Sequence, residues 1–60
     1  MVLYTRDVMN ITGRSRRTAY RLMQKIRHFF GKSEAGFVTL KEFCIYCEME
    51  EEEVMKYLKH

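Results

Sequence analysis

The sequence has no proline, three glycines, two cysteines and no long hydrophobic run among its 60 residues. The absence of proline favours helices, because proline breaks them. Since no stretch of about 18 apolar residues occurs, no transmembrane helix is expected. The first residues, MVLYTRD, do not combine a basic segment with a hydrophobic stretch. We therefore expect no secretory signal, and the predicted location is the cytoplasm.

The two cysteines, Cys44 and Cys47, stand three residues apart, a spacing familiar from metal and redox sites. A zinc site needs four ligands, and His28 and His60 are too far apart in sequence to form a second pair. A thioredoxin-like site needs a βαβ unit, which this sequence does not predict. We expect two reduced thiols in the core, no metal and no cofactor. Since no glycine-rich phosphate loop and no supported Ser-His-acid grouping occur, an enzyme is not expected.

Apolar residues make up 47% of the chain, which is enough for a single core, and the charges are unevenly distributed. Residues 1–36 carry eight basic and two acidic side chains, a net charge of +6. Residues 37–60 carry three basic and six acidic side chains, a net charge of −3. A polyanion is attracted by one half and repelled by the other, which orients its binding. The alternative is that both charged runs are ordinary solvated helix faces.

The segment TRDVMNITGRSRRTAYRLMQKIRHFF, residues 5–30, predicts a short helix, a tight turn and a longer helix. Gly13 supplies the positive φ that ends the first helix, in which Val8, Ile11 and Thr12 are expected on one side. Ser15 is the expected N-cap of the second helix. Spacings of three and four then place the apolar residues of that helix on one stripe, which comprises Ala19, Leu22, Met23, Ile26, Phe29 and Phe30.

The segment GKSEAGF, residues 31–37, predicts a loop, because it combines two glycines with small polar residues. An alternative is a short hairpin, the wing of a winged helix-turn-helix, in which Phe29-Phe30 pairs with Phe37-Val38. The residues that follow predict two more helices. Thr39 and Glu42 have capping-box spacing, and the inner stripe of the third helix is expected to be Leu40, Phe43, Tyr46 and Cys47. A fourth helix starts near Glu50, and its inward residues are expected to be Val54, Tyr57 and Leu58.

The segment LYTRDVMNITGRSRRTAYRLMQKI resembles the helix-turn-helix of the MerR/excisionase-type DNA-binding proteins. Asp7-Val8 and the run from Gly13 to Leu22 match the family pattern, an acidic residue before an aliphatic one and then G-x-S-x-R-T. The remainder is similar to small helix-turn-helix proteins common on bacterial mobile elements. This resemblance implies a sequence-specific DNA-binding protein, either a small transcriptional regulator or an excisionase-like factor.

We expect the second helix of the helix-turn-helix to be the recognition helix. When such a helix is inserted into the groove, its N-terminal side chains reach the base edges. The candidates for base contact are Arg16, Arg17, Tyr20 and Arg21. Arginine is suited to this role because it bonds bidentately to the edge of guanine. Side chains farther out are expected to contact phosphates, which sets register rather than sequence. These candidates are Arg14, Ser15, Gln24, Lys25 and Arg27.

The sequence therefore predicts an all-α, compact four-helix domain that spans residues 1–60. It consists of a helix-turn-helix (1–30), a loop or wing (31–38) and a C-terminal helix pair (39–60). The expected partner is double-stranded DNA, bound by a homodimer or a cooperative assembly, because a lone copy presents little surface. The expected contact surfaces between copies are Phe29-Phe30 and the region of Met49, Met55 and Tyr57. Two alternatives are a protein-interaction module that uses the acidic helix pair and an RNA-binding helical module.

Overall fold

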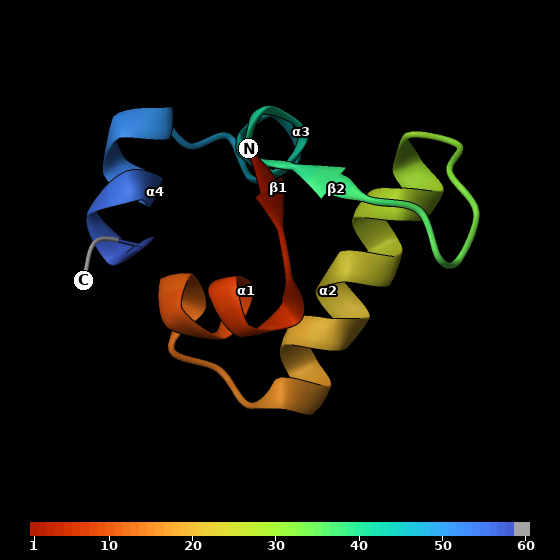
Figure 1. The fold of residues 1–60 in the computed structure, drawn as a ribbon, viewed down its shortest axis with the longest axis horizontal. Coiled ribbons are helices and arrows are strands. Elements are labelled where there is room, and N and C mark those ends of the chain that lie inside the picture. The colour runs from red at the N-terminus through yellow and green to blue at the C-terminus, as the bar shows by residue number, and fades with distance from the viewer. Residues whose placement is uncertain (59–60) are drawn as a thin grey trace.

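The computed structural model describes residues 1–58, and these form four helices and a sheet of two short strands (Figure 1). The order along the chain is β1 (Val2–Leu3), α1 (Thr5–Thr12), α2 (Arg16–Phe29), β2 (Val38–Thr39), α3 (Leu40–Cys47) and α4 (Glu51–Leu58). The prediction of a mainly helical protein with four helices is confirmed. The sheet that β1 and β2 form was not predicted.

The junction of α1 and α2 follows the residues that predicted it. Gly13 has φ = 70° and donates its N–H to the carbonyl oxygen of Met9 at 2.8 Å, which closes α1. Ser15 caps α2, because its Oγ accepts a hydrogen bond from the Thr18 N–H at 3.3 Å. At the other end of α1, the Tyr4 N–H donates to Asp7 Oδ2 at 2.8 Å. These local bonds fix where both helices begin and how sharply the chain turns between them.

The C-terminus of α2 closes with a left-handed glycine. Gly31 has φ = 68° and donates its N–H to the His28 carbonyl oxygen at 3.1 Å. The N–H of Lys32 reaches back to the Arg27 carbonyl oxygen at 2.8 Å. This pair of bonds is a Schellman motif, which satisfies carbonyls that the helix leaves without a partner. Phe29 therefore remains helical and cannot take part in a hairpin.

The hairpin-wing alternative is thus wrong for the described residues. β2 pairs instead with β1 in an antiparallel arrangement, with Val2 opposite Thr39 and Leu3 opposite Val38. Residues 31–37 form the loop that their composition predicts, and they lead from α2 back to the sheet (Figure 1). The sheet ties the N-terminus of the chain to the start of α3.

The capping box of α3 is confirmed. Thr39 Oγ1 accepts from the Glu42 N–H at 3.1 Å, and Glu42 Oε1 accepts from the Thr39 N–H at 2.9 Å. The C-cap of α3 is Glu48, which adopts a left-handed conformation with φ = 55° although it is not glycine. The chain then turns into α4, whose first turn carries Glu51, Glu52 and Glu53.

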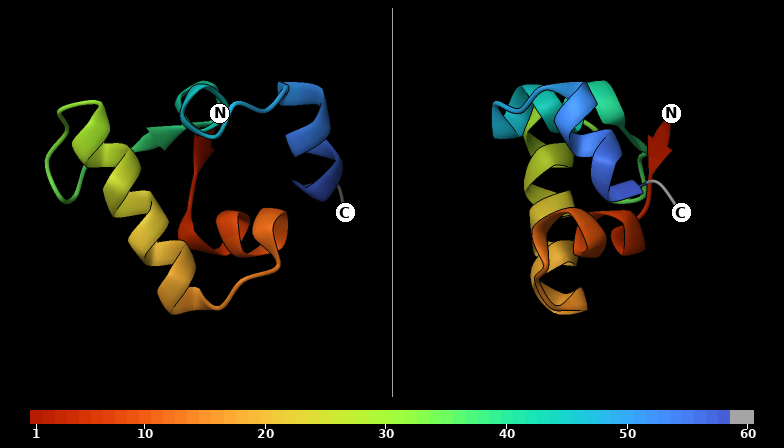
Figure 2. Two further views of the ribbon diagram at one scale, coloured as in Figure 1. Left: turned by 180° about the vertical axis from the view of Figure 1, so that it is seen from behind. Right: turned by 90° about the vertical axis from the view of Figure 1, so that its left-hand side faces the viewer.

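The core lies where all the helices and the sheet meet. Its fully buried large side chains come from every element and are Leu3, Val8, Met23, Ile26, Val38, Phe43 and Val54. α1 packs against both α2 and α4. The molecule measures 29 × 21 × 17 Å, and α2 runs from the lower middle to the upper right of Figure 1 while α4 lies at the left. Figure 2 shows the same separation from behind.

Three side chains expected to face the core do not. Tyr57 is 54% exposed and Phe29 63% exposed, while Thr12 is exposed and bonds through Oγ1 to the carbonyl oxygen of Val8. Tyr57 points away because α4 contacts α1 and α3 along a narrow side where Val54 is buried. Phe29 lies at the end of α2, beyond the core, where its ring stacks edge-on with Phe30 and Tyr46.

Candidate nucleic-acid interface

α2 has a buried face and a basic face. Ala19, Met23 and Ile26 are buried against the rest of the molecule. The four candidate base-contact residues are all exposed, as is Lys25, and they are Arg16, Arg17, Tyr20 and Arg21. The structure therefore brings these predicted side chains together on the solvent side of one helix.

Little acid within the protein offsets the positive charge of this face. α2 contains five basic and no acidic residues. In the part of the chain that the structure describes, the one ion pair joins Lys32 to Glu42, outside this helix. Among the described residues, the guanidinium groups of Arg16, Arg17 and Arg21 therefore have no acidic partner.

The position of Arg16 and Arg17 in the helix is unfavourable for stability. Both lie in the first turn of α2, where backbone N–H groups already give a partial positive charge. A cation there costs about 0.3–1 kcal/mol at an exposed site. α4 has the opposite arrangement, with three glutamates in its first turn. The helix dipole therefore does not account for the placement of these two arginines.

The tight turn presents two of the predicted phosphate-contact residues, Arg14 and Ser15, both exposed. The backbone N–H of Arg14 donates to Thr12 Oγ1 at 3.2 Å, while its exposed side chain makes no ion pair with the described residues. The Ser15 hydroxyl is instead used within the protein. It accepts from the Thr18 N–H and donates to Thr18 Oγ1 at 3.2 Å.

Gln24 and Arg27, also predicted to contact phosphates, belong to a chain of hydrogen bonds on one flank of α2. Arg27 Nε donates to the Gly36 carbonyl oxygen at 2.6 Å, and its Nη1 donates to Gln24 Oε1 at 3.1 Å. Gln24 Nε2 in turn donates to the Tyr20 hydroxyl at 2.8 Å. Arg27 therefore anchors the loop as well as contributing charge, and the phosphate roles of both residues stay predictions.

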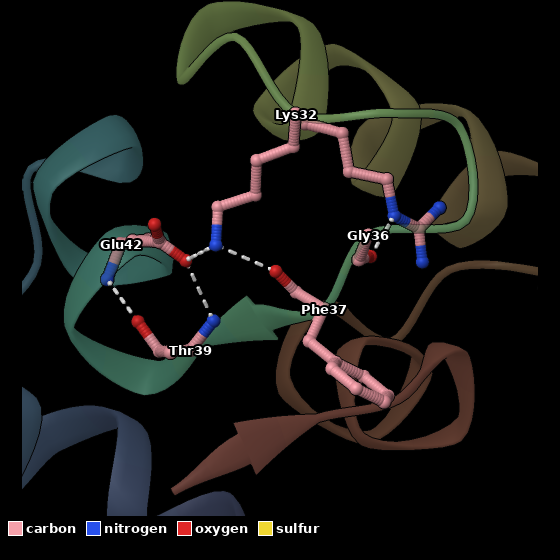
Figure 3. A network of polar contacts seen from close by, with 6 residues as sticks. Lys32, Gly36, Phe37, Thr39 and Glu42 are labelled. Carbon is pink, nitrogen blue, oxygen red and sulfur yellow. Dashed lines mark hydrogen bonds and ion pairs between the residues drawn. The ribbon is translucent and has the colours of Figure 1, made fainter.

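Lys32 secures the other half of the loop (Figure 3). Its Nζ donates to the carbonyl oxygen of Phe37 at 2.7 Å and to Glu42 Oε1 at 2.7 Å. The same carboxylate accepts from the Thr39 N–H. The hydrogen bonds from Lys32 and Thr39 hold the pKa of Glu42 below its ordinary value. The loop is thus fixed at two successive carbonyls, Gly36 by Arg27 and Phe37 by Lys32.

Arg6 is a further basic residue near this face, and it was not among the predicted contact residues. It is exposed on α1, and it lines an open groove with Arg16 from the start of α2. The groove also includes Tyr4, Thr5, Asp7 and Met9. The signal available in the sequence was the position of Arg6 in the first turn of α1, the helix that precedes α2.

The acidic end of the molecule shows no comparable site. Cys44 is buried and Cys47 half-buried, and both thiols are free. Burial raises the pKa of Cys44, with a further contribution from the negative charge of Glu51 and Glu50. Among residues 1–58, no three His, Cys, Asp or Glu side chains gather closely enough to hold a metal ion. Within the same range, no helix has the length and apolar character needed to cross a bilayer.

Comparison of the chain with protein-family models, with curated proteins and with solved structures found no match.

Proposed function

We propose that this protein binds double-stranded DNA in a sequence-specific manner, with α1 and α2 acting as a helix-turn-helix. The observation that carries the proposal is the exposed face of α2, where Arg16, Arg17, Tyr20 and Arg21 lie together without an acidic partner among the described residues. Two of these cations stand where they oppose the helix dipole, so the face is better suited to an external polyanion than to stability.

In the proposed complex, the N-terminal half of α2 enters the major groove, which is wide enough to admit a helix. Arg17 and Arg21 are four residues apart and lie on the same outward side. They would bond to the edges of purines, chiefly guanine N7 and O6. Arg14 in the turn, Arg6 on α1 and Lys25 farther along α2 would contact phosphates on either side.

The separation of charge supports one orientation on DNA. The basic first half of α2 lies at the lower middle of Figure 1, and the acidic first turn of α4 lies at the upper left. When α2 faces the duplex, the glutamates point away from the phosphates, which minimises repulsion. The biological role that we propose is that of a small transcriptional regulator or an excisionase-like factor.

A single copy presents only one short helix to the groove, which limits its affinity. We propose that two copies bind adjacent half-sites about one helical turn apart. Exposed Phe29 and Tyr57 are candidates for contacts between these copies. Sedimentation of the protein with a duplex that carries two half-sites tests this point. A strictly one-to-one, non-cooperative complex would contradict it.

The direct test of DNA binding is a salt titration with a pool of random duplexes. We expect binding at low salt that weakens steeply as the salt concentration rises. A plot of the logarithm of the binding constant against that of the salt concentration should have a slope of about −0.9 for each phosphate contacted. Glu51→Gln serves as a control, because it changes the charge at the far end of the molecule. The absence of any duplex binding at low salt, even at high protein concentration, would refute the proposed function.

A further inference from the structure

Within residues 1–58, Tyr20 is the one candidate base-contact residue whose polar group is bonded to another side chain. Its hydroxyl accepts a hydrogen bond from Gln24 Nε2 at 2.8 Å, while the residue as a whole is 52% exposed. A tyrosine hydroxyl has one proton to donate and lone pairs that accept. The groups around the hydroxyl decide whether it presents its proton or a lone pair to solvent.

Arg27 fixes the direction of this hydrogen-bond chain. A guanidinium can only donate, so the Gln24 atom that faces Arg27 Nη1 at 3.1 Å must be the amide oxygen. The amide nitrogen then faces Tyr20, and it also can only donate. Arg27 is itself fixed, because its Nε is bonded to the Gly36 carbonyl oxygen at 2.6 Å.

The consequence is that the Tyr20 hydroxyl uses an acceptor site for Gln24 and directs its proton away from Gln24. Among the described residues, the bond from Gln24 is the one hydrogen bond that this hydroxyl makes. An outward O–H requires an acceptor from the ligand.

We propose that Gln24 is a positioning residue that makes the Tyr20 hydroxyl a fixed hydrogen-bond donor toward DNA. This inference rests on the proposed function and specifies the chemistry that Tyr20 recognises. The complementary group is an acceptor, namely guanine N7 or O6, adenine N7, thymine O4 or a phosphate oxygen. Because the amino groups of adenine and cytosine are donors, they cannot accept the proton of the Tyr20 hydroxyl.

The test uses Gln24→Glu, which preserves size but reverses the polarity of the chain. The introduced carboxylate still accepts from Arg27, but it also accepts the proton of Tyr20 and so withdraws the donor from the DNA. It also adds a negative charge near the duplex, and this effect must be separated from the first. A double-mutant cycle with Tyr20→Phe does so, because in the phenylalanine background only the charge effect remains.

We expect Tyr20→Phe to weaken binding to the preferred duplex about three- to tenfold, the effect of one hydrogen bond. Gln24→Glu should weaken binding more in the Tyr20 protein than in the Tyr20→Phe protein, by a similar factor of about three to ten. Thermal unfolding of all four proteins should show that each is fully folded at the temperature of the titration. Sites selected from random duplexes identify the acceptor. A change at one base position indicates a base edge, and a uniform loss on all duplexes indicates a phosphate.

Two outcomes would overturn the inference, and they can be told apart. If the unaltered protein binds no duplex, the proposed function fails and this inference fails with it. If that protein binds DNA but Gln24→Glu has the same effect in both backgrounds, only the positioning role fails. Gln24 would then act through its bond to Arg27 or through charge alone.

Discussion

Lys32 Nζ lies 2.7 Å from Glu42 Oε1, and this ion pair joins the loop after α2 to the first turn of α3. Both side chains are largely buried, with exposed fractions of 28% and 20%. Because the same carboxylate caps α3 through the Thr39 N–H, one group stabilises the loop and the helix together. The structure therefore predicts that loop geometry and acid stability depend on Glu42.

Glu42→Gln should lower the free energy of unfolding by about 0.5–1.5 kcal/mol at neutral pH. The pKa of Glu42 is lower in the folded protein than its ordinary value of 4.5. Its contribution is therefore full above that value and is lost as the pH falls through the lower pKa of the folded state. Urea unfolding of the unaltered protein and of Glu42→Gln across the acid range measures this loss of stability. Glu34→Gln, in the exposed part of the loop, is the control. A deficit that persists unchanged in strong acid would contradict the ion-pair explanation.

Arg17→Glu should stabilise the fold while it removes DNA binding. The change replaces a cation by an anion in the first turn of α2, which is worth about 0.3–1 kcal/mol in favour of folding. Glu52→Arg is the matched variant, because it makes the reverse change at the same position of α4. It should lower stability and leave DNA binding intact. Thermal unfolding gives the stability of both variants, and duplex titration gives their affinities for DNA. If Arg17→Glu destabilised the protein, Arg17 would have a structural role that the exposed side chain does not suggest.

Glu48→Gly should raise the free energy of unfolding by about 0.5–1 kcal/mol. Glu48 has φ = 55°, a conformation that strains any residue with a Cβ, and glycine adopts it without that strain. The opposite change, Gly13→Ala, should lower stability by about 1 kcal/mol or more. An added Cβ at Gly13 would meet no atom within 4 Å, so this loss isolates backbone strain. Equal stabilities for Glu48→Gly and the unaltered protein would show that the strain is relieved by other means.

Local signals in the sequence predicted the helices well. Gly13, Ser15 and the Thr39–Glu42 pair act through bonds to residues within four positions, so their effect can be inferred from spacing alone. The exposed basic face of α2 follows in the same way from the apolar stripe that includes Ala19 and Met23.

Contacts between distant segments were not predictable in the same way. β1 and β2 have two residues each, too few to show alternation, and they pair across more than thirty positions of sequence. The bond from Arg27 to the Gly36 carbonyl depends on the course of the loop, which composition does not determine. For the same reason the outward position of Tyr57 could not be inferred from helical spacing alone.

In the proposed complex, the outer face of α2 discriminates between bases as well as attracting phosphates. The affinities of Arg17→Ala, Arg21→Ala and Lys25→Ala for the preferred duplex, and for single-base variants of it, test this discrimination. Each arginine change should cost about 1–3 kcal/mol on the preferred duplex and relax preference at particular positions. Lys25→Ala should weaken binding to every duplex alike and reduce the salt slope by about one. If all three variants lose the same affinity on every duplex, α2 is an electrostatic anchor and does not recognise sequence.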